Sequence, residues 1–382
     1  MKHISFLFVL LSVFFSAQKL QVVDAENGKP IANARIVLSD QLVYTNEDGF
    51  ATVSENSKDF EISASGFKNE KVKNFNSVIK LQSAIKDIEE VKIVNVDIKK
   101  LFEDVFKNYQ KRYYEEPSLY DVVLKQKNFD NGKLHFMVIS EAKLWSKSNW
   151  YNFKDGYHKK YDDILQLQLN NVKYLKRTDS DSVFFAQVGG LRHEQMGQYY
   201  FNFELNRTLQ SLKLAKSKYS GTLISEEGDD QLISFKMKIE NGSNITGTLK
   251  YNKIDKVITF FEIKYDLEEL ATRKLVATDG REFSVKGGRA TMTYDFYKKD
   301  GIYLPALTRI GSDNYTYFYN DETHVKSWMR EIVYNTFAKS DKKGLDHKVD
   351  FSKNIWENVP VKDDKETTIL LSKEEQEFIN KK

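Results

Sequence analysis

Turn signals divide much of this sequence into segments of strand length. Between residues 20 and 81, short apolar runs alternate with turns such as Asp48-Gly49, in which glycine supplies the positive φ that the turn requires. From Phe60 to Ala64, apolar and polar residues alternate, which puts one face of a strand in a core and the other in water. This pattern predicts a small all-β sandwich over residues 18–83.

The same segment carries four motifs in a fixed order. They are Gly28-Lys29-Pro30-Ile31, Ala34-Arg35-Ile36-Val37, Thr45-Asn46-Glu47-Asp48-Gly49-Phe50 and Phe60-Glu61-Ile62-Ser63-Ala64-Ser65-Gly66-Phe67. As a set they resemble the carboxypeptidase-like regulatory domain, a transthyretin-like (prealbumin-like) β-sandwich. The resemblance implies an accessory domain without peptidase activity of its own. It also implies a cell-envelope protein of the Bacteroidota type, in which such a domain directly follows the signal peptide.

The first residues predict export. Lys2 and His3 precede a run from Ile4 to Phe15 that is apolar except for two serines, an order typical of a secretory signal peptide over residues 1–17. The run is too short to span a bilayer stably. Cleavage after Ala17 would give a protein of the periplasm, the outer membrane or the exterior. A retained membrane anchor is the alternative, because Phe15 stands where a small residue is preferred.

The amino-acid composition excludes some classes of partner and some sources of stability. The 382 residues contain no cysteine, which excludes disulfide stapling and a lipid-modified cysteine anchor, so stability must come from packed cores. The formal net charge is +3 with well-mixed signs, so no nucleic-acid partner is predicted. No later stretch reaches the length of a membrane helix, and membrane association is at most peripheral. The length predicts a second, larger domain.

Residues 84–118 predict a connector with one amphipathic helix. Alternation from Ile88 to Val94 indicates a further strand or an extended segment. Asp97 then precedes apolar residues three or four apart, and Pro117 ends the pattern, as in a capped helix with one apolar stripe. We expect this stripe to pack on a sheet rather than form a groove for a partner.

Residues 119–338 predict a larger antiparallel β domain. Asn-Gly and Asp-Gly pairs separate long alternating runs, and Asp300-Gly301 marks the clearest hairpin. Before it, Met292 and Phe296 share one face of a strand. After it, Pro305 indicates an edge strand or a bulge, because proline cannot donate to a sheet ladder.

This larger domain resembles the uncharacterised β-rich region that follows the regulatory domain in many Bacteroidota envelope proteins, through segments such as Gly247-Thr248-Leu249-Lys250-Tyr251 and Lys299-Asp300-Gly301-Ile302-Tyr303-Leu304-Pro305. Its strand-rich order is also similar to the curved half-barrel of periplasmic lipoprotein carriers. The chain is thus predicted to be mainly β: a small sandwich, one linking helix and a larger antiparallel sheet, with a half-barrel as one form. A polar tail over residues 339–382 follows, in which Ser372 and Glu375 could open a short helix or fray.

No residue pattern specifies a catalyst, a metal or a cofactor. The six histidines are scattered, and His193-Glu194 lacks the second histidine of a zinc helix, since Gly197 stands there. Serines lack Gly-x-Ser-x-Gly surroundings, and a chain without cysteine has no thiol nucleophile. Acidic pairs such as Glu226-Glu227 and Asp229-Asp230 favour solvated turns over a glycosidase site. We therefore predict no catalytic, cofactor-binding or metal residue, and a protein that is not an enzyme.

One aromatic group is a candidate ligand surface. Trp145, Trp150, Tyr151 and Phe153 lie close together in the sequence. Rings of this kind can stack against a sugar. The alternative is that these side chains fill the core of a large sheet.

Three functional hypotheses remain. The first is a non-catalytic envelope protein that binds or scaffolds another envelope protein or a glycan through its β domains. The second is a periplasmic carrier of lipid or lipoprotein, with a concave apolar face on the large sheet. The third is a hydrolase whose site is too dispersed to recognise in sequence. An apolar hollow would favour the second, and carboxylates gathered in one cleft would favour the third.

Overall fold

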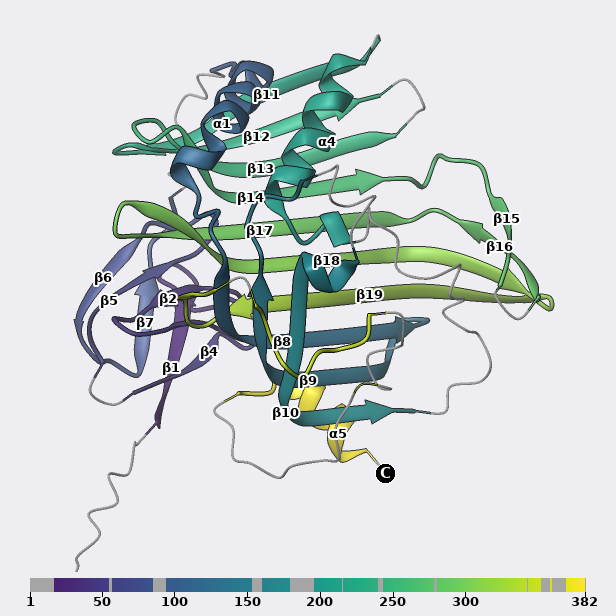
Figure 1. Cartoon of the computed structure of the whole chain (residues 1–382), viewed down its shortest axis with the longest axis horizontal. Coiled ribbons are helices and arrows are strands. Elements are labelled where there is room, and N and C mark those ends of the chain that lie inside the picture. Colours follow the sequence, from purple (N-terminus) through teal and green to yellow (C-terminus); the bar gives the residue numbers. More distant parts are fainter. Residues whose placement is uncertain are drawn as a thin grey trace, which may run out of the picture.

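The computed structural model describes most of the chain, in the ranges 17–54, 57–84, 94–152, 160–178, 196–214, 216–239, 243–277, 280–341, 343–351, 358 and 369–381. The predicted signal peptide lies outside the described residues except for its last position. Most of the alternating segment after Ile88 also lies outside them, as does His193-Glu194. The described part is mainly β, as the sequence predicts (Figure 1).

The N-terminal segment folds into two small sheets packed face to face, in the orders β4-β1-β7 and β3-β2-β5-β6. Their facing side chains, among them Leu20, Ile36 and Ile62, are fully buried. Gly49 is required at its turn, because its φ is +76° and a Cβ there would lie 2.7 Å from the Val22 carbonyl oxygen. The strands are β1 Ala17–Asp24, β2 Arg35–Val37, β3 Leu42–Tyr44, β4 Phe50–Ser54, β5 Lys58–Ser63, β6 Glu70–Asn74 and β7 Val78–Leu81.

The rest of the chain forms one large antiparallel sheet. Its main path is β10-β9-β8-β19-β18-β17-β14-β13-β12-β11, while β15, β16 and β20 pair beside it. The sheet is open, with β10 and β11 as the ends of that path. The strands are β8 Ser118–Asp130, β9 Lys133–Ser146, β10 Leu165–Arg177, β11 Lys218–Glu227, β12 Asp230–Lys238, β13 Asn244–Asn252, β14 Val257–Asp266, β15 Arg273–Val276, β16 Glu282–Lys286, β17 Arg289–Lys299, β18 Ile302–Tyr319, β19 Glu322–Tyr334 and β20 Ala338–Lys339.

Predicted turn chemistry fixes two of its hairpins. Asn131-Gly132 joins β8 to β9 with φ values of 48° and 73°, and Asp300-Gly301 joins β17 to β18 with 50° and 80°. Two consecutive positive φ angles are typical of the type I′ turn, whose twist suits a two-residue hairpin. The register of β17 and β18 shifts next to Pro305. The expected bulge at this proline is therefore confirmed.

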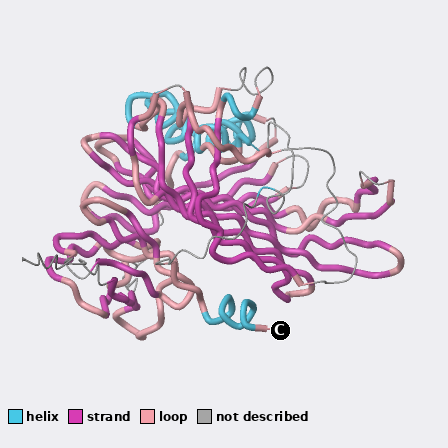
Figure 2. Tube along the Cα trace, turned by 60° about the horizontal axis from the view of Figure 1, so that its bottom comes forward, coloured by secondary structure: helices cyan, strands magenta, loops and turns pink. Residues whose placement is uncertain are grey.

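Helices α1 (Ile98–Arg112) and α4 (Phe201–Lys213) cover one face of the large sheet, which we call the helix face (Figure 2). The rings of Phe102 on α1 and Phe201 on α4 lie 6.0 and 5.4 Å from the ring of Phe261 on β14. Asp97 caps α1 as predicted, because its carboxylate accepts from the Lys100 N–H at 3.0 Å. The apolar stripe of α1 packs on a sheet, as expected.

Helix α4 is an addition to the predicted fold, which contains one linking helix. Its buried apolar residues have helical spacing. However, Tyr200 at the N-cap makes no side-chain capping bond, so the segment lacks the start signal by which helices are recognised in sequence. The short helix η1 (Tyr161–Asp163) precedes β10.

The C-terminal segment ends in a docked helix, α5 (Lys373–Asn380). Ser372 accepts from the N–H of Glu375, and Glu375 accepts in return from the N–H of Ser372. This is the capping box that the sequence offers. Phe378 is buried against Met137 and Ile139 of β9. Thus the helical alternative, rather than the frayed one, holds for these residues.

The sandwich and α5 lie on the side of the large sheet opposite the helix face (Figure 2). Side chains alternate between the two faces. On β17, for example, Tyr294 and Phe296 enter the core beneath α1 and α4, and Asp295 points toward the sandwich. In the described residues, no helix has the length and apolar character needed to cross a membrane.

Candidate functional site

A cleft of about 630 Å³ lies between the sandwich and the large sheet. One wall comes from β2, β3, β5 and the turn after β5. The other comes from outward-facing side chains of β11 to β14, β17 and β18. Both bodies therefore contribute to the cleft, and its shape depends on how the sandwich is held.

A buried ion pair closes the inner end of the cleft. Nη1 of Arg35 donates to Oδ1 of Asp295 and to the carbonyl oxygen of Phe296, both at 2.6 Å. The hydroxyl of Tyr44 donates to Oδ2 of Asp295 at 2.5 Å. Burial, and then the charge of Asp295, raise the pKa of Tyr44 well above its ordinary value. Burial alone would lower the pKa of Arg35, but the attraction of Asp295 raises it.

Backbone contacts continue this attachment along the sheet. The N–H of Leu42 donates to the carbonyl oxygen of Asn335 at 2.8 Å, and Nδ2 of Asn335 donates back to the carbonyl oxygen of Leu42 at 2.8 Å. The Leu42 side chain packs with Leu307 and Val333. Apolar burial and paired hydrogen bonds thus place β3 directly on the sheet.

The outer end of the cleft is bridged by a lighter contact. Nζ of Lys250 on β13 donates to Oδ1 of Asn69 at 3.1 Å. The same ammonium lies 3.7 Å from Oδ2 of Asp230, and Nδ2 of Asn252 donates to Oδ1 of Asp230 at 2.9 Å. These groups are exposed or half-exposed, so the bridge contributes little stability. The inner end is consequently the rigid one.

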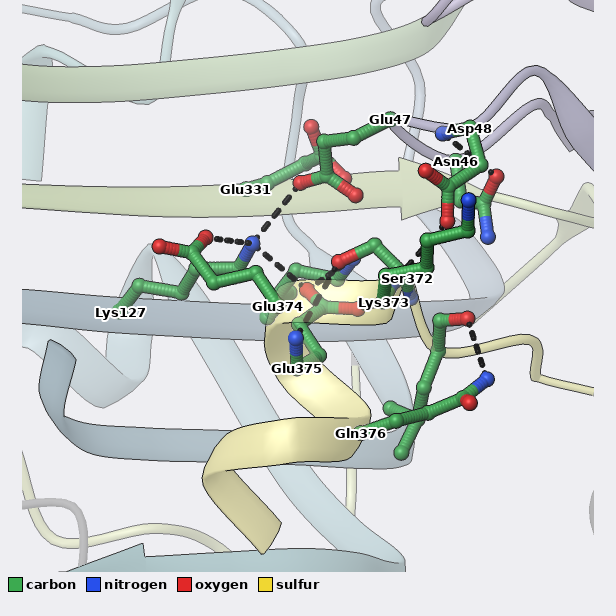
Figure 3. Close-up of polar contacts among 12 residues, drawn as sticks. Asn46, Glu47, Asp48, Lys127, Glu331, Ser372, Lys373, Glu374, Glu375 and Gln376 are labelled. Atoms are coloured by element: carbon green, nitrogen blue, oxygen red, sulfur yellow. Dashed lines mark hydrogen bonds and ion pairs between the residues drawn. The ribbon is translucent and has the colours of Figure 1, made fainter.

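A second charged cluster ties α5 to both bodies (Figure 3). Oε1 of the fully buried Glu375 lies 2.7 Å from Nζ of Lys127 and 2.9 Å from Nζ of Lys125, both on β8. Lys127 also donates to Oε1 of Glu47 in the β3–β4 turn at 2.8 Å. Next to it, Asp48 accepts from the backbone N–H of Lys373 at 2.9 Å. The cluster joins the sandwich, the sheet and α5 at one point.

The charges in this cluster shift one another's pKa values. Burial alone would raise the pKa of Glu47, but Lys125 and Lys127 together lower it to about 2. Burial likewise opposes ionisation of Glu375, yet the same two lysines lower its pKa below the ordinary value. Burial would lower the pKa of Lys127, and Glu375 and Glu47 raise it instead. All three groups are therefore charged at neutral pH.

Three residues of the predicted aromatic surface, Trp145, Trp150 and Tyr151, lie in the described part of the chain. Trp145 is 3% exposed, and its Nε1 donates to the carbonyl oxygen of Asp341 at 3.0 Å. The Trp150 ring lies 5.3 Å from the rings of both Phe106 and Tyr109 on α1. Tyr151 is buried and packs on Tyr200 and Phe203. Phe153 lies outside the described residues. The contacts described are those of core packing, and a stacking surface here stays a prediction.

Other candidates from the sequence lie in different places. Glu227 and Asp230 line the outer end of the cleft, while Glu226 pairs with Lys253 at 2.5 Å on the surface. Asp162 lies 3.5 Å from Lys348. Within the described ranges, no three His, Cys, Asp or Glu side chains gather closely enough to hold a metal ion.

Sequence reasoning did not find the residues that build the cleft. Arg35 and Asp295 are 260 positions apart, and no local pattern connects them. A weak signal was present, because each is a charge on a strand whose other residues are mostly apolar, aromatic or β-branched. Such a charge must face water or a partner of opposite sign.

Comparison with known proteins leaves the family open. No protein-family pattern and no curated protein matches the sequence. One solved structure resembles it, a protein from Bacteroides fragilis described as membrane-associated and of unknown function. The alignment covers 84% of this chain and 98% of that chain, with 11% identity and a TM-score of 0.14. A likeness at this level carries no argument about fold or function.

The buried cluster predicts unequal effects of two neighbouring substitutions. Glu375→Gln keeps a side chain that can complete the capping box, but it removes the buried charge opposite two lysines. We expect it to lower the free energy of unfolding by about 3 kcal/mol, since breaking a buried ion pair leaves the remaining charge buried without a partner. Glu374→Gln, at an exposed position 4.0 Å from Lys127, should change it by less than about 0.5 kcal/mol. Urea unfolding measures both, and equal losses would contradict this role for Glu375.

The lowered pKa values predict acid sensitivity. A carboxylate whose pKa falls from 4.5 to about 2 on folding, as for Glu47, gives its full stabilisation above about pH 4.5. This stabilisation is lost as the pH falls through about 2, because the unfolded chain takes up protons first. In the double variant Glu47→Gln, Glu375→Gln, the free energy of unfolding should depend less on pH between pH 5 and pH 2. Glu70→Gln, at an exposed position on β6, should keep the wild-type slope, and identical slopes in all three proteins would refute the prediction.

Proposed function

We propose that this chain is an exported, non-catalytic binding protein of the cell envelope, with the cleft between its sandwich and its large sheet as the ligand site. The sandwich would be a carboxypeptidase-like regulatory domain acting as one wall of that site. Another envelope component or a glycan would be the ligand. The two-sheet architecture of residues 17–81 is compatible with such a domain.

The observation that carries the proposal is the cleft itself. Its volume of about 630 Å³ lies within the range of roughly 300–1,000 Å³ typical of small-molecule sites, which occur preferentially between domains. Its inner end is preorganised by the contacts of Arg35, Tyr44 and Asp295. Preorganised walls lower the entropy cost of holding a ligand.

The cleft also gathers carboxylates, which is the arrangement that a hydrolase would need. Asp295 is paired with Arg35, Glu262 lies 2.8 Å from Nζ of Lys264, and Asp230 accepts from Asn252. These carboxylates hold protein cations or amides, and a general acid or base has to reach the substrate's proton. Their pairing supports binding over catalysis.

A lipid carrier has less support. The space between α1, α4 and the sheet is filled by aromatic side chains, and a cavity found there measures about 30 Å³. That is room for about one water molecule. An acyl chain would need the aromatic core to open.

Export predicts the first residue of the mature protein. In the described structure, β1 begins at Ala17 and Gln18 pairs with Val53 in the sheet, so cleavage after Ala17 would remove the first residue of β1 and keep the rest of the strand. Intact mass and N-terminal peptides of protein from the native envelope should give a chain beginning at Gln18. A chain that still begins at Met1 would refute cleavage of this signal and favour the retained anchor.

Blocking the cleft predicts loss of ligand. Ser65 is exposed at the cleft wall, in the turn after β5, so Ser65→Trp should fill the cleft without touching a core. Ser77→Trp, at an exposed sandwich position that does not line the cleft, is the matched control. Each protein is incubated with the small-molecule fraction of an envelope extract and examined by native mass spectrometry. Wild type and the control should retain an added mass that Ser65→Trp loses at least about tenfold; no retained mass, or equal retention, would refute the cleft as the site.

A further inference from the structure

We infer that the cleft binds a neutral, hydroxyl-rich ligand, a short saccharide seated on the ring of Phe260. This inference rests on the proposed function and names the ligand class of the same site. Three features of the cleft carry it: the order of side chains across the sheet, the pairing of charges, and the pairing of the backbone.

The sheet register places six cleft residues in one row across six strands. In order from β11 to β18 they are Ser225, Leu232, Lys250, Phe260, Asp295 and Leu307. All six line the cleft. Phe261, the next residue on β14, is buried in the core on the helix face, so the Phe260 ring lies on the cleft side.

In this row, an aromatic ring is flanked by polar groups on both sides. Lys250 and Asp295 are the direct register partners of Phe260 on β13 and β17. Neighbouring strands are about 4.8 Å apart, which is close to the width of a sugar ring. A pyranose packed with its C–H face on the Phe260 ring would present its equatorial hydroxyls to these two side chains. Few ligands offer an apolar face with hydroxyls around its rim.

The charges of the cleft favour a neutral ligand. Four of its cations are already in ion pairs: Arg35 with Asp295, Lys250 with Asp230, Lys298 with Asp255 and Arg309 with Glu331. At the inner end of the cleft, an ionic ligand would have to break the pair of Arg35 with Asp295, and separating a buried pair is costly. A hydroxyl group donates and accepts at once, so it can use the remaining lone pairs of a paired carboxylate.

The backbone of the cleft offers little to a peptide. A peptide that adds to a sheet needs the free edge of a strand. Strands β2 and β5 each pair on both sides, as do β12, β13, β14, β17 and β18. Strand β3 is at an edge of the sandwich, and its Leu42 N–H bonds to the Asn335 carbonyl oxygen. Of the large-sheet strands that line the cleft, β11 is at an edge, and its residues 221–223 bond to residues 94–96. Recognition in the cleft therefore depends on side chains, as it does for saccharides.

The test compares ligand classes on the full mature chain. Three probe sets are used in native mass spectrometry and titration calorimetry: neutral di- and trisaccharides, the same sizes containing uronic acids, and tripeptides. The proteins are wild type, Ser65→Trp, Phe260→Ala, Phe260→Tyr and Tyr219→Ala. Tyr219 is 42% exposed on β11 and does not line the cleft, so it controls for the loss of a surface ring.

We expect a neutral saccharide to bind, Phe260→Ala to weaken it about tenfold, and Phe260→Tyr and Tyr219→Ala to bind like wild type. If uronic-acid probes or tripeptides bind instead, and Ser65→Trp abolishes that binding, the cleft is a ligand site and the saccharide inference is wrong. If no class binds, or if Ser65→Trp and Phe260→Ala both leave binding unchanged, the saccharide inference and the proposed site are wrong together.

Discussion

The salt bridge between Arg35 and Asp295 is the contact on which the arrangement of the molecule depends. It joins the sandwich to the middle of the large sheet, and its two side chains are only 12% and 13% exposed. A buried ion pair gives little net stability, because desolvation offsets the attraction. It does impose orientation, since any other placement of the sandwich would leave a buried charge without a partner. The cleft exists because the sandwich is fixed at this end and only lightly bridged at the other.

The cluster around Glu375, on the C-terminal helix α5, also holds the sandwich against the large sheet. Glu47 belongs to the sandwich, Lys125 and Lys127 to β8, and Glu375 to α5. Removing Glu375 would leave Lys125 and Lys127 buried without the carboxylate that they share, whereas apolar packing alone would tolerate a shift of α5. The segment predicted as a polar tail therefore includes a helix that packs against the sheet and the sandwich. Its polarity reflects ionic packing as well as exposure to water.

Local features of the fold could be predicted from the sequence, and distant pairings could not. The Asp97 cap, the Asp300-Gly301 hairpin and the Ser372–Glu375 capping box each depend on residues a few positions apart. Their chemistry can therefore be identified in a short window. The pairing of β8 with β19 joins residues about 200 positions apart, and the contact of Arg35 with Asp295 is longer still. The order of strands in a sheet is set by global packing, and in a single sequence it leaves no local trace.

The bulge next to Pro305 shows how one local feature makes a distant contact possible. Pro305 lies opposite Phe296 in the register and has no N–H to donate to the ladder. The Phe296 carbonyl oxygen accepts from Arg35 of the sandwich. On the far side of the bulge, Asp295 is paired with Phe260 and faces the cleft. A one-residue slip in a strand turns every later side chain to the other face. The extra residue here is Ala306 on β18, so the bulge changes which residues of β18 face the sandwich, while β17 keeps its regular alternation. Bulges beside functional sites commonly re-aim side chains. Here two consecutive residues of β18, Ala306 and Leu307, both pack with Leu42 of the sandwich, so the bulge widens the surface on which the sandwich rests.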